Sequence, residues 1–260
     1  MGMSQEPKKQ DTEDFEDGPA AGYETACCPG HLFLPNRLVK GYDAFLNGRF
    51  AQEHGRFRKL AETGQKPKVL LIGCSDSRVS PEVIFDAEPG EIFVIRNVAN
   101  LIPPYRPDTD LHGTSAALEF GVVALGVEHI VVMGHALCGG VRAFAQHESD
   151  PHYTPLSPGD FIGHWISLIE PAAEKLGPRR ETEPLADYSE RLAKASVVQQ
   201  LANLRGFPYI KDREADGRLK LHGAYFGIAD GLLLALNEET GQFLPVAEET
   251  HPALSAKPKA

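Results

Sequence analysis

Two short segments carry most of the residues that could do chemistry. Gly73–Arg78 (GCSDSR) places a thiol, a carboxylate and a guanidinium on alternate residues, and Gly134–Gly140 (GHALCGG) places a thiol three residues after an imidazole. Two thiolates and one histidine supply three corners of a tetrahedral zinc site, and a catalytic site keeps its fourth corner open to water. If the two segments meet in space, Cys74, His135 and Cys138 are a candidate zinc site.

Other interpretations of these segments compete with zinc. A single cysteine in a buried strand is usually a small apolar residue. Two glycines before a helix could face a phosphate, but the chain has no GxGxxG motif and no Walker lysine. A cysteine phosphatase loop needs a longer spacing than the three residues that separate Cys74 from Arg78. Zinc is the one interpretation that uses both segments together.

Apolar runs end at both segments. Lys68–Gly73 and His129–Gly134 are short apolar runs, typical of buried parallel strands, and further strands are expected at Ile92–Ile95 and Leu219–Phe226. In an open α/β sheet, ligands bind in the crevice beyond the carboxyl ends of the strands. The two segments are therefore expected to converge there, although they are far apart in the sequence.

Apolar residues at helical spacing lie between and before these strands. They predict helices over Gly113–Leu125, Asp160–Leu176 and Tyr188–Leu204, and an amphipathic helical arm over about residues 36–55. Strands alternating with helices predict an α/β fold with a mainly parallel central β-sheet flanked by helices. The arm precedes every strand, so it needs a further surface to pack on.

Composition limits the class of protein. The chain has 260 residues, 42% of them hydrophobic, which is enough to bury a core. Residues 1–30 are acidic and rich in Gly and Pro, so they are expected to form a disordered tail before a single domain over 31–260. A net charge of −10 disfavours nucleic acid as a partner. No apolar run approaches the ~18 residues of a membrane helix. The N-terminus has no apolar signal-peptide core and is too acidic for a transit peptide. Together these features predict a cytoplasmic protein.

The two segments and their surroundings resemble the β-class carbonic anhydrases. The resemblance runs from about Gln65 to Val141 through CSDSR, EPGEIFVIRNVANLIPPY, GTSAALEFGVVALGVEHIVVMGH and HALCGG, with weaker similarity in NLRGFPYI and HGAYFGIADG. It implies a lyase, a carbonate dehydratase, that uses Zn²⁺ to interconvert CO2 and bicarbonate. It also implies that Cys74, His135 and Cys138 are the zinc ligands.

The resemblance further makes Asp76 and Arg78 a catalytic dyad. Zinc lowers the pKa of its water far below the bulk ~15.7, so that hydroxide is available to attack CO2. Asp76, held ionised by Arg78, can accept the hydrogen of that hydroxide and turn a lone pair towards the substrate. The planar fork of Arg78 suits a carboxylate as a lysine would not. In another context such a pair would be read as a surface ion pair in a turn.

The resemblance is closer to the open, plant-type subclass. Members prone to closure, in which the dyad aspartate takes the fourth zinc position, carry a Trp and a late Tyr where this chain has Leu71 and Phe226. Open members carry a Gln, a Phe and an aromatic residue where this chain has Gln65, Phe93 and Phe120, the last in place of the usual Tyr. These three are the expected substrate-binding residues: an amide for a substrate oxygen and two rings for a small apolar pocket.

Two alternatives stay open beside this prediction. A relative that hydrolyses CS2 or COS would share every motif, whereas a zinc-stabilised binding module without turnover would need neither the dyad nor Gln65. The resemblance also implies a homodimer or a higher homo-oligomer, with the arm around the partner and the pocket near the interface. The adjacent Cys27 and Cys28, and the remaining histidines, are not expected to bind zinc.

Overall fold

A computed structural model describes residues 34–147 and 154–246. The expected disordered tail over 1–30, including Cys27 and Cys28, lies outside the described residues. The chain divides between Lys59 and Leu60 into two compact units. A single domain over 31–260 therefore stays a prediction.

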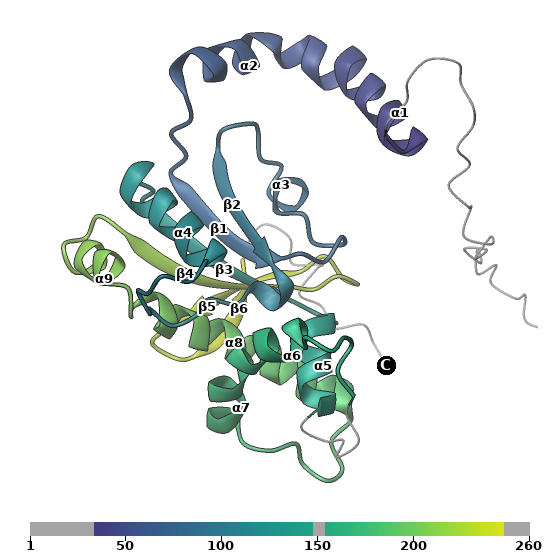
Figure 1. Cartoon of the computed structure of the whole chain (residues 1–260), viewed down its shortest axis with the longest axis vertical. Helices are drawn as coiled ribbons and strands as arrows, with labels where there is room; N and C mark the ends of the chain where they lie inside the picture. Colours follow the sequence, from purple (N-terminus) through teal and green to yellow (C-terminus); the bar gives the residue numbers. More distant parts are fainter. Residues whose placement is uncertain (1–33, 148–153, 247–260) are drawn as a thin grey trace, which may run out of the picture. The chain divides into compact units, whose positions relative to one another are not determined.

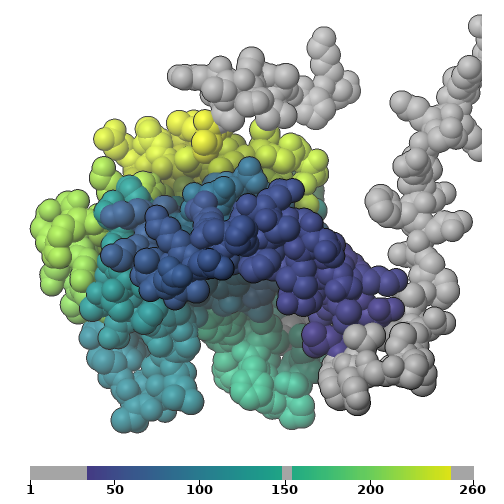
Figure 2. All heavy atoms as spheres, turned by 90° about the horizontal axis from the view of Figure 1, so that it is seen from above, coloured from purple at the N-terminus to yellow at the C-terminus, as the bar shows by residue number. Residues whose placement is uncertain are grey.

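The N-terminal arm is helical, as predicted, and longer than expected. It consists of α1 (Asn36–Phe45), a π-helical turn (Leu46–Phe50) and α2 (Ala51–Thr63), and its side chains form one elongated strip in Figure 2. The arm continues to Gly64, whose φ of +73° is the left-handed conformation that commonly ends a helix. None of the residues of α1, the π turn or α2 is buried.

The central sheet has six strands in the order β2-β1-β3-β4-β5-β6 (Figure 1). The first four are parallel and the last two are antiparallel additions, so the prediction of a mainly parallel sheet is confirmed. The strands are β1 (Val69–Cys74), β2 (Ile92–Asn97), β3 (His129–His135), β4 (Lys220–Phe226), β5 (Leu233–Asn237) and β6 (Gln242–Pro245). Every residue of β1 except Val69 is buried, as expected for a parallel strand covered on both faces.

Helices connect the parallel strands and cover the sheet. They are α3 (Pro81–Ile84), α4 (Gly113–Glu119), α5 (Gly139–His147), α6 (Phe161–Ile166), α7 (Glu170–Leu176), α8 (Leu185–Leu204) and α9 (Pro208–Ala215). The long α8 packs against β3 and β4 and also contacts α5 and α7. The single helix expected over Asp160–Leu176 is divided into α6, a 3₁₀ turn and α7. No described helix is long and apolar enough to cross a bilayer.

Candidate metal centre

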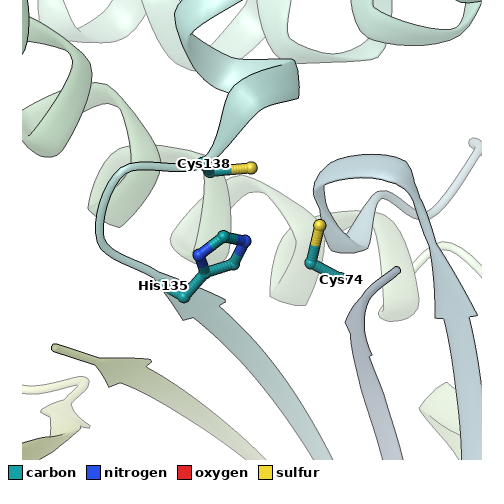
Figure 3. A group of neighbouring side chains, drawn as sticks. All are labelled: Cys74, His135 and Cys138. Carbon is teal, nitrogen blue, oxygen red and sulfur yellow. The ribbon is translucent and has the colours of Figure 1, made fainter. Parts of the chain in front are cut away.

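The carboxyl ends of two neighbouring strands bring the two chemical segments together. Cys74 is the last residue of β1 and His135 the last of β3, which pairs directly with β1, and Cys138 lies just before α5. The two Sγ atoms and one ring nitrogen of His135 all lie within 4.8 Å of one another, and all three residues are buried. Figure 3 shows the three side chains pointing towards one shared space. The predicted convergence is confirmed.

The tautomer of the His135 imidazole suits cation binding. His135 Nδ1 lies 2.8 Å from the carbonyl oxygen of Ala136, so this nitrogen carries the proton and donates it. The other nitrogen, Nε2, is buried and has no hydrogen-bond partner among the described residues. A buried unsatisfied lone pair is costly, whereas a metal ion satisfies it and requires this same tautomer. The donor set therefore fits Zn²⁺.

The two thiols have conflicting protonation states. Contact with Cys138, with smaller effects from the neighbouring His135 and from backbone amides, lowers the pKa of Cys74 to about 4 despite burial. The same contact with Cys74, together with burial, raises the pKa of Cys138 well above its usual value. One thiol thus ionises at the expense of the other. A divalent cation stabilises both thiolates and removes the conflict.

Backbone amides surround both sulfurs. The Ala99 amide donates to Cys74 Sγ at 3.3 Å, and the amides of Gly140 and Val141 hydrogen-bond to Cys138 and lower its pKa, against the larger effects that raise it. A side chain at Gly140 would place its Cβ 3.0 Å from that of Ala99, closer than such atoms normally approach. A glycine at this position lets α5 start close to the other sulfur.

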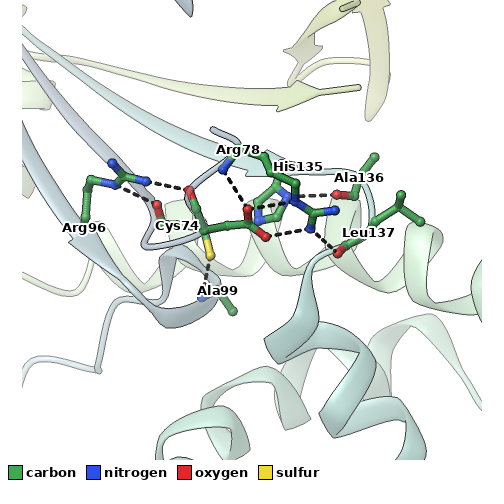
Figure 4. A network of polar contacts seen from close by, with 8 residues as sticks. Cys74, Arg78, Arg96, Ala99, His135, Ala136 and Leu137 are labelled. Carbon is green, nitrogen blue, oxygen red and sulfur yellow. Dashed lines mark hydrogen bonds and ion pairs between the residues drawn. The ribbon is translucent and has the colours of Figure 1, made fainter. Parts of the chain in front are cut away.

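Asp76 and Arg78 form a bidentate ion pair beside the cluster. Arg78 donates from Nε to Asp76 Oδ1 at 2.9 Å and from Nη2 to Oδ2 at 2.7 Å, and its backbone amide adds a bond to Oδ1 at 3.0 Å. These donors, led by the guanidinium, hold the pKa of Asp76 far below its usual range. Arg78 Nη2 also donates to the carbonyl of Leu137 at 3.2 Å, so one guanidinium joins the two segments (Figure 4).

Arg96 contacts the backbone of the site, and sequence reasoning missed it. Its Nε donates to the Cys74 carbonyl at 2.9 Å and its Nη2 to the Asp76 carbonyl at 2.6 Å (Figure 4). The guanidinium thereby fixes the backbone on both sides of Ser75. The available signal was an arginine directly after the apolar run Ile92–Ile95. The pairing of Arg96 with Gly73 in the sheet places it next to the segment that follows β1.

The expected substrate residues are not beside the metal cluster of the same chain. The rings of Phe93 and Phe120 do lie together, with centroids 5.9 Å apart. However, Phe93 pairs with Leu70, four residues before Cys74, so it lies roughly 13 Å from the cluster along the strand direction. Gln65 is exposed in the loop before β1, also towards the amino end of that strand. A single chain therefore does not build the expected pocket.

The chain is similar to known carbonic anhydrases in sequence. Residues 69–233 match the model of a family described as carbonic anhydrase. The carbonic anhydrase of Pseudomonas aeruginosa is 37% identical over 219 residues, which cover 84% of this chain and 94% of that protein. The chloroplastic β carbonic anhydrase 5 of Arabidopsis thaliana is 35% identical over 72% of this chain and 60% of that protein.

Solved structures of the same class are similar in fold. The β-carbonic anhydrase CcaA superposes with a TM-score of 0.70 at 32% identity, covering 80% of this chain and 90% of that one. Tetrameric β-carbonic anhydrases from Sordaria macrospora superpose with a TM-score of 0.64 at 32% identity, covering 77% and 95% of the two chains.

Proposed function

The chain belongs to the β-class carbonic anhydrases, zinc enzymes that hydrate CO2, and we propose that Cys74, His135, Cys138, Asp76 and Arg78 form its active site. The observation that carries this proposal is the buried, unpartnered Nε2 of His135, which belongs to the same cluster as the two thiols. When bound, zinc supplies a Lewis acid that lowers the pKa of water from ~15.7 towards neutrality.

Asp76 orients the attacking oxygen in this proposal. The bidentate bond to Arg78 fixes both carboxylate oxygens in place. Its low pKa keeps the group ionised, so it can accept a hydrogen bond but cannot donate one. A hydrogen of the attacking oxygen then points at Asp76, and a lone pair is left free to face the carbon of CO2.

We place this chain in the open subclass, in which Asp76 stays off the metal. Two observations support this placement. The Asp76 carboxylate is not part of the group of ligand atoms within 4.8 Å of one another, and both of its oxygens are bound by Arg78. Leu71 and Phe226 occupy the positions at which closure-prone members carry Trp and Tyr, and both pack into one apolar cluster.

A second copy of the chain completes the substrate pocket in this proposal. Gln65, Phe93 and Phe120 lie towards the amino end of β1, so another protomer must bring them to the metal centre. Apolar side chains suited to such an interface are exposed at Phe120 (49%) and, beside the cluster, at Leu137 (68%). The arm supports the same assembly, because it contains no buried residue that would fix it within its own chain.

Gln65→Ala is expected to lower kcat/KM without loss of zinc. The substitution removes a substrate hydrogen bond worth ~0.5–1.5 kcal/mol, which corresponds to a fall of about 2-fold to 10-fold. Steady-state hydration kinetics and zinc content on the same sample test this. Lys66→Ala, at the next exposed position of the loop, is the control and should leave both unchanged. An unchanged kcat/KM in Gln65→Ala would remove Gln65 from the pocket.

Hydration is expected to rise with pH through and beyond neutrality. The thiolates of Cys74 and Cys138 cancel both charges of zinc, so they weaken its pull on water, which should titrate above the ~7 of three-histidine sites. Asp76 does not contribute a step, since its depressed pKa keeps it ionised until strongly acidic pH. The measurement is kcat/KM from mildly acidic to alkaline pH. A flat or falling profile would contradict this account of the nucleophile.

Substrate choice within the fold is tested with CS2 and COS. The purified enzyme should turn over CO2 much faster than either sulfur compound, because the family model and the relatives that this chain matches are carbonic anhydrases. The three rates are measured under the same conditions. Preference for CS2 or COS would replace the CO2 assignment while leaving the metal centre in place.

A further inference from the structure

The turn Val98–Leu101, which follows β2, lies against the metal centre in a strained conformation. Ala99 and Asn100 have φ values of 62° and 51°, in the left-handed region that residues other than glycine rarely adopt. Such a conformation persists only where the surrounding structure holds it. In this conformation the amide of Ala99 donates to Cys74 Sγ at 3.3 Å (Figure 4).

Two side chains of α8 hold the residue that follows this turn. The Ile102 amide donates to Gln200 Oε1 at 2.7 Å, and Asn203 Nδ2 donates to the Ile102 carbonyl at 2.8 Å. Both backbone polar groups of Ile102 are therefore bound by one helix. Gln200 has no exposed surface and lies on the helix that contributes Val197 and Leu201 to the apolar core.

Two more hydrogen-bonding side chains hold the same turn. Asn97 directly precedes the turn, and its side chain accepts from the Leu101 amide and donates to the Leu101 carbonyl, both at 2.8 Å. Trp165 of α6 donates from Nε1 to the Val98 carbonyl, also at 2.8 Å. The turn is thus held from both ends, and its Ala99 amide points at a proposed metal ligand. Burying the Gln200 carboxamide destabilises the fold unless its hydrogen bonds are made. The bond that it accepts from the Ile102 amide compensates for this burial and at the same time holds the turn.

We propose that Gln200 is a positioning residue for the zinc centre: by holding Ile102 it keeps the Ala99 amide on the Cys74 sulfur. A hydrogen bond to a thiolate withdraws electron density from the sulfur, so the metal keeps more of its positive charge. Gln200 thereby acts on the metal through the strained turn without touching the metal or its ligands. This inference rests on the proposed zinc ligands.

The test replaces zinc by cobalt(II), whose thiolate charge-transfer band reports electron density on the sulfur. Gln200→Met keeps the length of the side chain but removes the acceptor for the Ile102 amide. Gln200→Glu keeps an acceptor at that position while burying an acidic group, so it destabilises the fold by another route. Ile210→Val shortens a buried core side chain in α9 and serves as the control for loss of stability alone. The four proteins are compared by the cobalt band, by zinc release to a chelator and by thermal unfolding.

Gln200→Met is expected to move the charge-transfer band to longer wavelength and to weaken zinc binding by about 10-fold, the scale found for residues that orient metal ligands. Gln200→Glu and Ile210→Val should keep the wild-type band even where their unfolding temperatures fall. An unmoved band in Gln200→Met, or the same shift in all three variants, would overturn the positioning role. If the wild-type protein itself gives no thiolate-to-cobalt band, the proposed ligand set fails instead.

Discussion

Cys74→Ser is expected to lose zinc and to abolish CO2 hydration, and Cys138→Ser should do the same. A serine hydroxyl is not deprotonated at neutral pH and is a harder ligand than this donor set provides. The buried His135 Nε2 would then face one thiol and a neutral hydroxyl, which leaves too few anionic ligands for the cation. The loss of rate should exceed about 100-fold, the upper range for changes to residues that only orient metal ligands.

Elemental analysis and hydration assays on each purified variant check this result. The matched control is the double variant Cys27→Ser with Cys28→Ser, which removes the two remaining cysteines of the chain. That variant should keep wild-type zinc content and rate. Full zinc occupancy in Cys74→Ser would show that the ligand set is wrong.

Asp76→Asn is expected to retain zinc but to lose hydration by about 100-fold or more, within the range for groups that orient or accept a proton in catalysis. The amide carries no charge to pair with Arg78 and offers a donor where the attacking oxygen needs an acceptor. Because the Asp76 carboxylate lies outside the cluster of ligand atoms, the metal content should not change. Arg78→Lys should also be poor, since a lysine cannot make the bidentate bond.

The chain contains a matched control for the dyad. Asp216 and Arg218 have the same spacing as Asp76 and Arg78 and form the same pair, with Arg218 Nε 2.9 Å from Asp216 Oδ1. Asp216→Asn removes this exposed pair and should leave the hydration rate unchanged. Full activity in Asp76→Asn, or an equal loss in Asp216→Asn, would remove the dyad from the mechanism.

These two pairs also show how far sequence reasoning reaches. The sequences DSR and DGR have the same spacing of Asp and Arg. What distinguishes Asp76 from Asp216 is that Asp76 lies two residues after Cys74, the last residue of β1. The metal cluster could be predicted because apolar runs mark parallel strands, and adjacent parallel strands end at one edge of a sheet. The sequence analysis did not predict the short antiparallel strands Leu233–Asn237 and Gln242–Pro245. Both lie at the end of the sheet and neither contains a buried residue, so no buried apolar run marks them.

Contacts between distant segments could not be predicted from the sequence. The bonds of Arg96 to two carbonyls depend on the register of β2 against β1. The bond of Gln200 to Ile102 joins residues 98 positions apart. The substrate pocket stays a prediction. Residue types suggest that Gln65, Phe93 and Phe120 act together, but their distance from Cys74 depends on the strand register, which is why the proposed pocket uses a second protomer.

The most direct test of the central claim measures zinc content and CO2 hydration rate on one purified sample. We expect zinc equivalent to one ion per chain, and a hydration rate that falls as a chelator removes zinc and returns when zinc is restored. A protein that holds this zinc yet does not accelerate hydration, or one that hydrates CO2 at the same rate after zinc is removed, would contradict the account.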